Sequence, residues 1–215
     1  MSASVSRWSE WWSLSAAPAP PVAVELAARR ISAAALEIRG GVPTVVAHAS
    51  EPLQDGVLVA SLTAENLRDR AAVAGALGRV LDKVGRPRRI GLIVPDPVAR
   101  VSLVRFEQVP ADTRDLDQLI RWQVRKSAPF PIESAQVSYV AGERTAEGQE
   151  FVVTLARQDI VREYETLCEA AGTQAGIVDI STFNVINAAL ASGPAAGDWL
   201  LVNVAADYAS MAILR

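Results

Sequence analysis

The chain has 215 residues, half of them hydrophobic, and a formal net charge of −3, so it is long enough for one large domain or two small ones. The composition lacks the basic excess that usually accompanies nucleic-acid binding, so we expect no nucleic-acid partner. A single cysteine, Cys168, excludes a disulfide framework, and a single histidine, His48, excludes a histidine-cluster metal site and most His-based triads.

Residues 1–21 are predicted to be a tail and a Pro/Ala-rich linker that precede the folded part. Trp8, Trp11 and Trp12 have i, i+3, i+4 spacing, so a short helix here would carry an aromatic face. Indole rings favour membrane interfaces and partner surfaces, which makes these three side chains a candidate anchor. A tail that packs back on the domain, or is disordered, is the alternative. The tail lacks the apolar core of a signal peptide, and no run of about 18 apolar residues predicts a membrane span.

Residues 22–96 predict the first part of an α/β domain with a mixed sheet. Three short apolar runs are predicted as strands: Val22–Leu26, Ile31–Ile38 and Thr44–Ala49. A further apolar run spans Val57–Leu62. Apolar residues at helical spacing then indicate a helix that ends near Val84, with Gly85 as its stop. The continuous apolar run Arg89–Val94 is typical of a buried parallel strand, and Asp96-Pro97 ends it.

Residues 97–157 predict a compact strand–helix–strand–strand unit inserted after that strand. The expected elements are a strand at Arg100–Glu107, a helix at Leu116–Ala128, and strands at Gln136–Ala141 and Glu150–Ala156. A polar connection, Gly142–Gly148, is expected between the last two strands.

The helix at Leu116–Ala128 carries the candidate partner-binding residues. Leu116, Leu119, Ile120 and Val124 share one face, and Pro129 and Pro131 force a rigid exit. Exposed aromatic and basic residues together suit a protein interface. The candidates are Arg121, Trp122, Arg125, Lys126 and Phe130. We expect Trp122 and Lys126 to meet on the exposed flank. The alternative is a half-buried Trp122 at the sheet margin, with the charges in solvent.

Residues 158–198 predict the second part of the α/β domain. A helix is expected at Ile160–Ala171, with Cys168 as a small core residue, then a strand at Ile177–Ile180 and a helix from Ser181 to about Leu190. Residues 199–215 predict a hairpin of Leu200–Val204 and Tyr208–Leu214. Neither G-x-G-x-x-G nor G-x-x-x-x-G-K-[ST] occurs, which argues against a dinucleotide or P-loop fold.

The order of these elements and several short strings resemble one family. Its most specific strings are Ile120-Arg121-Trp122, Ala128-Pro129-Phe130-Pro131 and Ser138-Tyr139, supported by Leu53-Gln54-Asp55-Gly56, Gln108-Val109-Pro110 and Ala170-Ala171-Gly172. From about Val22 to Arg215 the chain resembles the PilM family, actin-like cytoplasmic proteins of type IV pilus assembly that are related to the division protein FtsA.

The resemblance implies an actin-like (ribonuclease H-type) subdomain 1A and an inserted SHS2-like subdomain 1C at 97–157. The second actin-type lobe would begin at 199–215 and be largely absent from this chain. It further implies a cytoplasmic adaptor, held at the inner membrane by its partners, that binds the N-terminal tail of a PilN-like protein in a groove between 1A and 1C. Other pilus platform components and self-association through 1C are further implied contacts.

Actin-like relatives hold ATP and Mg²⁺ on two phosphate-binding hairpins, and both are altered here. The resemblance aligns the first with Glu25, Ala27, Ala28 and Arg29, and the second with Asn203, Ala205 and Ala206. Glu25 and Asn203 stand where the family has aspartate, and Ala27 and Ala205 where it has glycine. A neutral amide binds Mg²⁺ less well than a carboxylate does. We therefore expect a scaffold without ATP hydrolysis.

Three other functions fit parts of the pattern. An actin-fold ATPase or sugar-kinase-like enzyme would need the missing glycines. A GspL-like platform protein of type II secretion has a similar fold and role. A division-type polymer former would assemble filaments.

Overall fold

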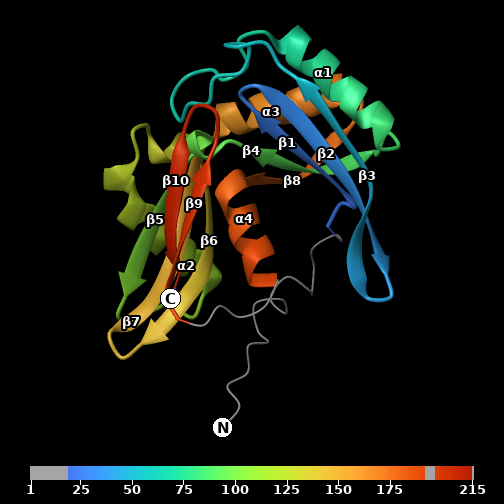
Figure 1. The fold of residues 1–215 in the computed structure, drawn as a ribbon. Helices are drawn as coiled ribbons and strands as arrows, with labels where there is room; N and C mark the ends of the chain where they lie inside the picture. Colours follow the sequence, from blue (N-terminus) through green and yellow to red (C-terminus); the bar gives the residue numbers. More distant parts are fainter. Residues whose placement is uncertain (1–18, 192–196, 215) are drawn as a thin grey trace.

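A computed structural model describes residues 19–191 and 197–214, and the candidate anchor at Trp8, Trp11 and Trp12 lies outside these ranges (Figure 1). The elements, in which η marks a 3₁₀ turn, are β1 (Val22–Ala27), β2 (Arg30–Arg39), β3 (Val42–Pro52), α1 (Arg70–Lys83), β4 (Arg89–Val94), η1 (Asp96–Val98), β5 (Ala99–Phe106), α2 (Thr113–Val124), η2 (Arg125–Ser127), η3 (Ile132–Ser134), β6 (Ala135–Thr145), β7 (Gly148–Arg157), α3 (Gln158–Ala170), β8 (Gln174–Ile180), α4 (Ser181–Ala191), β9 (Trp199–Val204) and β10 (Ala209–Leu214).

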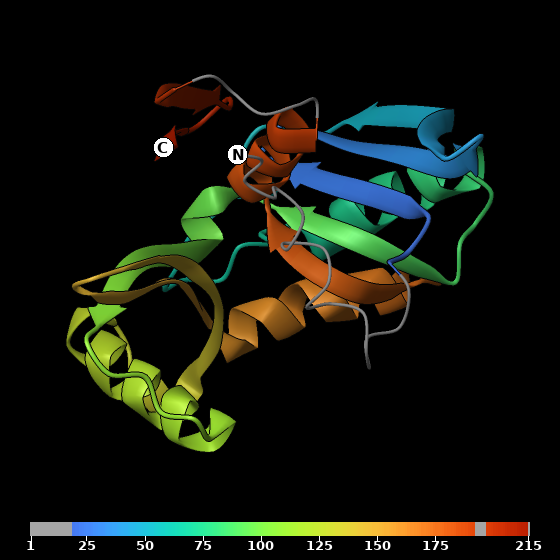
Figure 2. The same cartoon turned by 90° about the horizontal axis from the view of Figure 1, so that it is seen from below.

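A five-stranded mixed sheet in the order β3-β2-β1-β4-β8 forms the larger part of the fold. Strand β1 pairs antiparallel with β2 and parallel with β4, and β4 pairs parallel with β8. The prediction of an α/β domain with a mixed sheet is therefore confirmed. Helices α1 and α3 lie together against one face of this sheet (Figures 1 and 2).

The main core lies between that face and the two helices. Alternate residues of β1, namely Val22, Val24 and Leu26, are buried there, as the period-2 geometry of a strand requires. Leu77 of α1 and Cys168 of α3 are fully buried in the same cluster, so Cys168 is a core residue as predicted. Burying a side chain such as Leu77 contributes about 1.5–3 kcal/mol, which makes this layer the main source of stability.

A separate three-stranded antiparallel sheet in the order β5-β7-β6 carries α2 on one face and has its own core. We call residues 99–157 the insert. Ile120 and Val124 of α2 pack against Phe151 and Val153 of β7, so the predicted strand–helix–strand–strand order is confirmed.

The predicted polar connection at Gly142–Gly148 is wrong, because most of it belongs to the strands. Thr145 pairs with Gly148, so β6 and β7 run on to a two-residue turn at Ala146-Glu147. Gly148 has a φ of 132°, and a Cβ there would come within 2.3 Å of the Phe106 carbonyl oxygen. A glycine is therefore required where the hairpin closes.

The further apolar run at Val57–Leu62 joins none of the three sheets. In the structure this run is a loop, and only Leu58 forms a bridge, to Leu67. The side chain of Asn66 accepts from the backbone N–H of Ser61 and donates to the carbonyl groups of Ser61 and Ala64. Because one buried amide satisfies this backbone locally, the loop buries Leu58 without joining a sheet.

Strands β9 and β10 form a two-stranded antiparallel sheet as predicted, and α4 lies between this hairpin and the five-stranded sheet (Figure 1). Among the described helices, none is long and apolar enough to cross a membrane.

Candidate functional site

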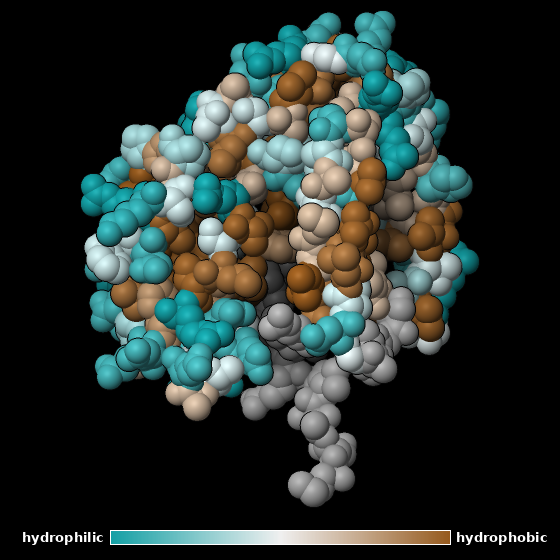
Figure 3. Space-filling model, turned by 60° about the vertical axis from the view of Figure 1, so that its left-hand side comes forward, coloured by the Kyte–Doolittle hydropathy of each residue, from teal (hydrophilic) through white to brown (hydrophobic). Residues whose placement is uncertain are grey.

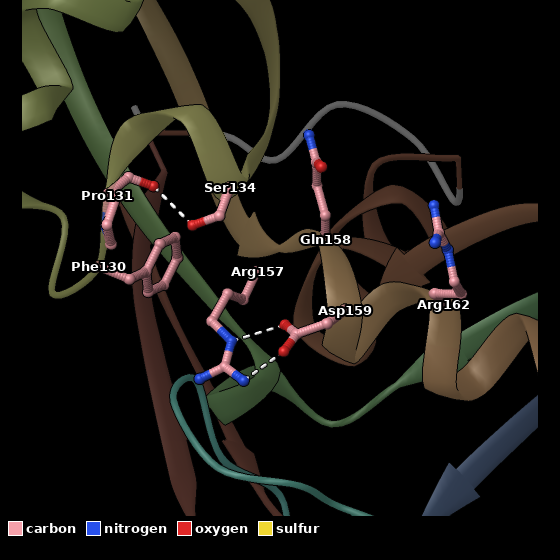
Figure 4. Close-up of a pocket in the computed structure, with 7 residues that line it drawn as sticks. All are labelled: Phe130, Pro131, Ser134, Arg157, Gln158, Asp159 and Arg162. Atoms are coloured by element: carbon pink, nitrogen blue, oxygen red, sulfur yellow. Dashed lines mark hydrogen bonds and ion pairs between the residues drawn. The ribbon is translucent and has the colours of Figure 1, made fainter.

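A cavity of about 480 Å³ lies where the insert meets α3. Figure 4 shows the seven residues that line it: Phe130, Pro131, Ser134, Arg157, Gln158, Asp159 and Arg162. The first three come from the chain between α2 and β6, and the other four come from the end of β7 and the first two turns of α3. The cavity therefore has an apolar wall from the insert and a polar wall from α3.

The apolar wall is held by the proline corner. Helix α2 ends at Val124 and tightens into η2, where the Ala128 N–H donates to the Val124 carbonyl at 3.1 Å. The predicted continuation of the helix to Ala128 is therefore wrong by one turn. The carbonyl of Pro131 accepts from the Ser134 hydroxyl at 2.7 Å, which fixes η3. Phe130, half-buried, packs on the core of the insert and turns toward the cavity (Figure 4).

The polar wall is ordered by an ion pair between Arg157 and Asp159. The Arg157 Nε lies 2.6 Å from the carboxylate of Asp159, a second guanidinium nitrogen pairs with its other oxygen, and the third donates to the Thr63 carbonyl. The hydrogen bond from Arg157 lowers the pKa of Asp159, and the same bond raises the pKa of Arg157. Arg157 thus ties the entry of α3 to the loop around Thr63.

Arg162 and Gln158 supply donors to the cavity. Gln158 donates to the Ala135 carbonyl at 3.2 Å, whereas Arg162 is exposed and forms no ion pair with any described carboxylate. A phenylalanine facing an arginine suits a peptide that presents an apolar side chain on one side and a carboxylate or carbonyl oxygen on the other.

A buried carboxylate braces this wall from behind. Glu163 is only 6% exposed, and its two oxygens accept the backbone N–H groups of Asn66 and Leu67 at 3.0 and 2.6 Å. The Tyr164 hydroxyl donates to the Asn66 side chain at 3.1 Å. Sequence reasoning missed Glu163 and Asn66, because their contact joins residues almost a hundred positions apart and no local pattern marks it.

Of the predicted partner residues, the structure places only Phe130 at this cavity. Trp122 is 64% exposed on α2, and Arg121 pairs with Asp117 at 2.8 Å one turn earlier. Arg125 and Lys126 are exposed on η2. The alternative of a half-buried Trp122 is wrong, and the four α2–η2 residues form a surface apart from the cavity.

A second apolar surface lies on the other side of the insert. In Figure 3 apolar residues gather on the outside of the three-stranded sheet and on the β9–β10 hairpin, with a hollow between them. The first wall includes Leu103, 65% exposed, and Val140, which flank their common ladder partner Val152. The hairpin wall consists of the residues that face away from α4, which are Leu200, Val202, Val204, Met211 and Ile213.

The two predicted phosphate hairpins meet at the start of α4. The Glu25 carboxylate and the Asn203 amide each lie 3.4 Å from the Ser181 hydroxyl. Ala28 and Arg29 form the tight β1–β2 turn, but Arg29 pairs with Asp55 at 3.0 Å instead of pointing to Ser181. Ala27 ends β1, and Ala205 and Ala206 form the β9–β10 turn.

Asp96 fills the space at the α4 N-terminus. Its carboxylate accepts the Thr182 N–H at 2.9 Å and also the hydroxyls of Thr182 and Ser210. Asn203 donates to the Thr182 hydroxyl at 3.0 Å. A helix N-terminus favours an anion, and here a protein carboxylate takes that place. Sequence reasoning missed this role, because Asp96 was interpreted only as the residue that ends a strand.

Two ionisable groups near this network have pKa values that burial shifts. Burial raises the pKa of Asp179, in spite of hydrogen bonds to Ile180 and Asn184, and it raises the pKa of Tyr208. Within residues 19–191 and 197–214, no three His, Cys, Asp or Glu side chains lie close enough to hold a metal ion.

Comparison with known proteins identifies both the family and the fold. The sequence matches the family model described as type IV pilus assembly protein PilM over residues 23–215. No curated protein matches the sequence. A PilM–PilN type IV pilus biogenesis complex contains a similar structure, with a TM-score of 0.76 and 21% identity over 91% of this chain. This chain spans 58% of that one.

A second similar structure is the cytoplasmic domain of EpsL, an inner-membrane component of the type II secretion system of Vibrio cholerae. Its TM-score is 0.53 at 11% identity, over 89% of this chain and 70% of that one. At these identities both likenesses establish the fold alone, which is the actin-like fold of PilM.

Proposed function

The chain belongs to the PilM family of type IV pilus assembly proteins, and we propose that it is a structural adaptor that binds the cytoplasmic N-terminal tail of an inner-membrane PilN-like protein. One of the similar structures is a PilM–PilN complex, which supports the choice of partner. In this proposal the five-stranded sheet with α1 and α3 is subdomain 1A, and the insert is the SHS2-like subdomain 1C. The adaptor works in the cytoplasm and is held at the inner membrane by its partners.

The cavity between the insert and α3 carries the proposal. It is a concave site at a junction between two separate cores, where ligands commonly bind. The proline corner and the Arg157–Asp159 pair fix its two walls before any ligand arrives, which lowers the entropic cost of binding. An apolar side chain of the tail would pack on Phe130, and a polar group would pair with Arg162.

The exposed α2–η2 surface is the proposed contact for further pilus platform components. Trp122 offers a large exposed ring, and Arg125 and Lys126 add cations next to it in the chain. Such a combination is typical of interface hot spots. Self-association through the insert would use the same surface or the apolar hollow of Figure 3.

We further propose that the protein acts without hydrolysing ATP. Glu25 and Asn203 replace the expected aspartates, and Ala27 and Ala205 replace glycines that would let the backbone approach a phosphate. The carboxylate of Asp96 takes up the donors at the α4 N-terminus, including the Thr182 N–H. Repulsion between this carboxylate and a phosphate opposes nucleotide binding.

Isothermal titration with a synthetic peptide tests the adaptor function. The peptide carries the cytoplasmic N-terminal residues of the PilN-like protein from the same genome, and a scrambled peptide is the control. We expect saturable one-to-one binding of the native peptide alone. Equal heats from both peptides, or none from either, would refute the adaptor proposal. A parallel titration with Mg-ATP should give no binding heat.

A further inference from the structure

The insert joins the rest of the fold at two crossings, and a charged side chain fixes each of them. The first crossing is η1, where the carboxylate of Asp96 accepts the Thr182 N–H at 2.9 Å and the hydroxyl of Ser210. The second is the step from β7 to α3, where Arg157 donates to the Thr63 carbonyl. One crossing is therefore attached to α4 and β10, and the other belongs to the polar wall of the cavity.

The first crossing is a short, stiff link. Pro97 lies within η1, and its ring fixes the backbone φ angle there. Val98, the last residue of η1, is buried in the main core. The backbone N–H of Ala99 donates to the carbonyl of Asp96. Asp96 thus holds the β9–β10 hairpin with its side chain and the first residue of the insert with its backbone.

The strand register carries this position across the sheet of the insert. Ala99 of β5 is the ladder partner of Ala156 of β7. The next residue of β7, Arg157, is the partner of Ala135 in β6. Directly opposed residues in an antiparallel ladder lie about 4.5–5.5 Å apart, so the roots of the three strands move together.

The root of β6 belongs to the cavity. Ala135 is fully buried and directly follows Ser134, a lining residue from the insert. Its carbonyl accepts the side-chain amide of Gln158, a lining residue from α3, at 3.2 Å. Figure 4 shows Ser134 and Gln158 on these two walls. The walls of the cavity therefore meet at the residue to which the register leads from η1.

We propose that occupancy of the cavity is coupled to the contact between Asp96 and the β9–β10 hairpin. The proposal rests on the proposed function, in which the tail of the PilN-like protein touches both walls. The insert and the five-stranded sheet have separate cores, so the insert pivots about its two crossings. A tail that bridges the walls restricts this pivot. It thereby lowers the entropic cost of keeping Asp96 in contact with Thr182 and Ser210.

This coupling is positive and works in both directions. Binding of the tail strengthens the attachment of the hairpin, and loosening the hairpin weakens binding of the tail by the same factor. Coupling between two sites typically changes an affinity by about fivefold or more. A partner that pulled the hairpin away from Asp96 would therefore release the tail without touching the cavity.

Titration of the tail peptide into hairpin variants tests the coupling. Asp96→Ala removes the link, and we expect the Kd to rise about fivefold, although Asp96 does not line the cavity. Ser210→Ala is milder, because the bond from the Thr182 N–H remains, and should raise the Kd about twofold. Ser50→Ala is the matched control. It removes a hydroxyl that bonds to the Ser32 hydroxyl on the far side of the large sheet, and it should leave the Kd unchanged.

Amide hydrogen exchange with saturating peptide gives a second readout. In the wild-type protein the peptide should slow exchange in β10 about fivefold, and it should also slow exchange at the cavity walls. In Asp96→Ala the peptide should slow exchange at the cavity walls alone.

A third measurement needs no peptide and separates the coupling from the adaptor function. Gln158→Ala frees the Ala135 carbonyl at the junction, and it should speed hydrogen exchange in β10 about threefold. Gln136→Ala, at an exposed position of β6 next to Ala135, is the control and should leave exchange in β10 unchanged.

The possible results separate the two proposals. An equal Kd in the wild type, Asp96→Ala and Ser210→Ala would overturn the coupling and leave the adaptor function intact. An equal loss of affinity in Ser50→Ala would also overturn it, because the loss would then be a general destabilisation. A peptide that does not bind the wild type would refute the adaptor function. The link between the cavity junction and the hairpin would then be decided by the effect of Gln158→Ala on β10.

Discussion

The Glu163 carboxylate lies 2.6 Å from the backbone nitrogen of Leu67, across 96 positions of sequence. Its other oxygen accepts the Asn66 N–H, so one buried side chain closes the loop that leads into α1. Arg157 of the cavity donates to Thr63 of the same loop. The candidate binding wall and the main core are therefore joined through this loop.

Replacing this carboxylate should destabilise the protein. In Glu163→Gln one of the two backbone N–H groups would face an amide donor in a buried place, which costs about 1–3 kcal/mol. Urea unfolding followed by circular dichroism measures the change. Glu165→Gln on the exposed side of α3 is the matched control and should stay within about 0.5 kcal/mol of wild type. Equal stability of the two variants would contradict the bracing role.

Charge reversal at the cavity should weaken binding of the PilN-like tail. Arg162→Glu replaces a donor by a carboxylate, and we expect an affinity loss of about tenfold, which corresponds to about 1.4 kcal/mol. Arg144→Glu makes the same change at the exposed tip of the insert and should leave the affinity unchanged. Titration of the same peptide into both variants decides the point. A loss of similar size in both would indicate general electrostatics and no specific contact.

The α2 surface gives a separate prediction. Trp122→Ala should leave binding of the tail peptide unchanged, because Trp122 does not line the cavity. It should instead weaken retention of other pilus platform components in a pull-down from the native membrane fraction. Phe130→Ala should show the opposite pattern. If Trp122→Ala weakened binding of the tail peptide and Phe130→Ala did not, the binding groove would lie at α2.

The Asp96 network should hold the β9–β10 hairpin. Asp96→Ala removes the acceptor of the Thr182 N–H and of the Ser210 hydroxyl, and loss of such a cap costs about 0.5–2 kcal/mol. Amide hydrogen exchange should rise in α4 and β10 and stay unchanged in β7. Asp82→Ala, an exposed position in α1, is the control. Uniformly faster hydrogen exchange across the whole chain would indicate global destabilisation. It would contradict a local role of Asp96 in holding the hairpin.

Cys168 should react only after unfolding. Burial raises the pKa of its thiol to about 12, so between pH 9 and 12 the folded protein keeps a proton that the unfolded chain releases. Stability should therefore fall as the pH rises through this window, and be unaffected by this thiol below it. Reaction with a chromogenic disulfide at pH 8 should be slow in buffer and fast in denaturant. Fast reaction in the folded state would show that α3 opens readily.

Local pattern was enough to predict most of the fold. Helix α1 is buried on one face, which gives a helical apolar period, and β4 is buried on both, which gives a continuous apolar run. Both patterns are visible among neighbouring residues of the sequence. Phe130, predicted as a partner-binding residue, lines the cavity, and the two prolines beside it limit where its ring can lie.

The features that local pattern did not reveal share a physical cause. The apolar run Val57–Leu62 stays a loop because the side chain of Asn66 satisfies its backbone. Asp96 reads as a strand end, and its contact with Thr182 depends on how β4 and α4 meet in space. Residues whose role is set by partners far along the chain leave no periodic signal for sequence reasoning to detect.

The insert begins and ends at one place. Ala99, its first residue, is the direct ladder partner of Ala156, so the two crossings into the rest of the fold lie about 5 Å apart. A bridge of one or two residues would close the gap if the whole segment were cut out, and any unit with adjacent ends could be grafted in its place. Evolution can therefore exchange the insert without redesigning the sheet that carries it.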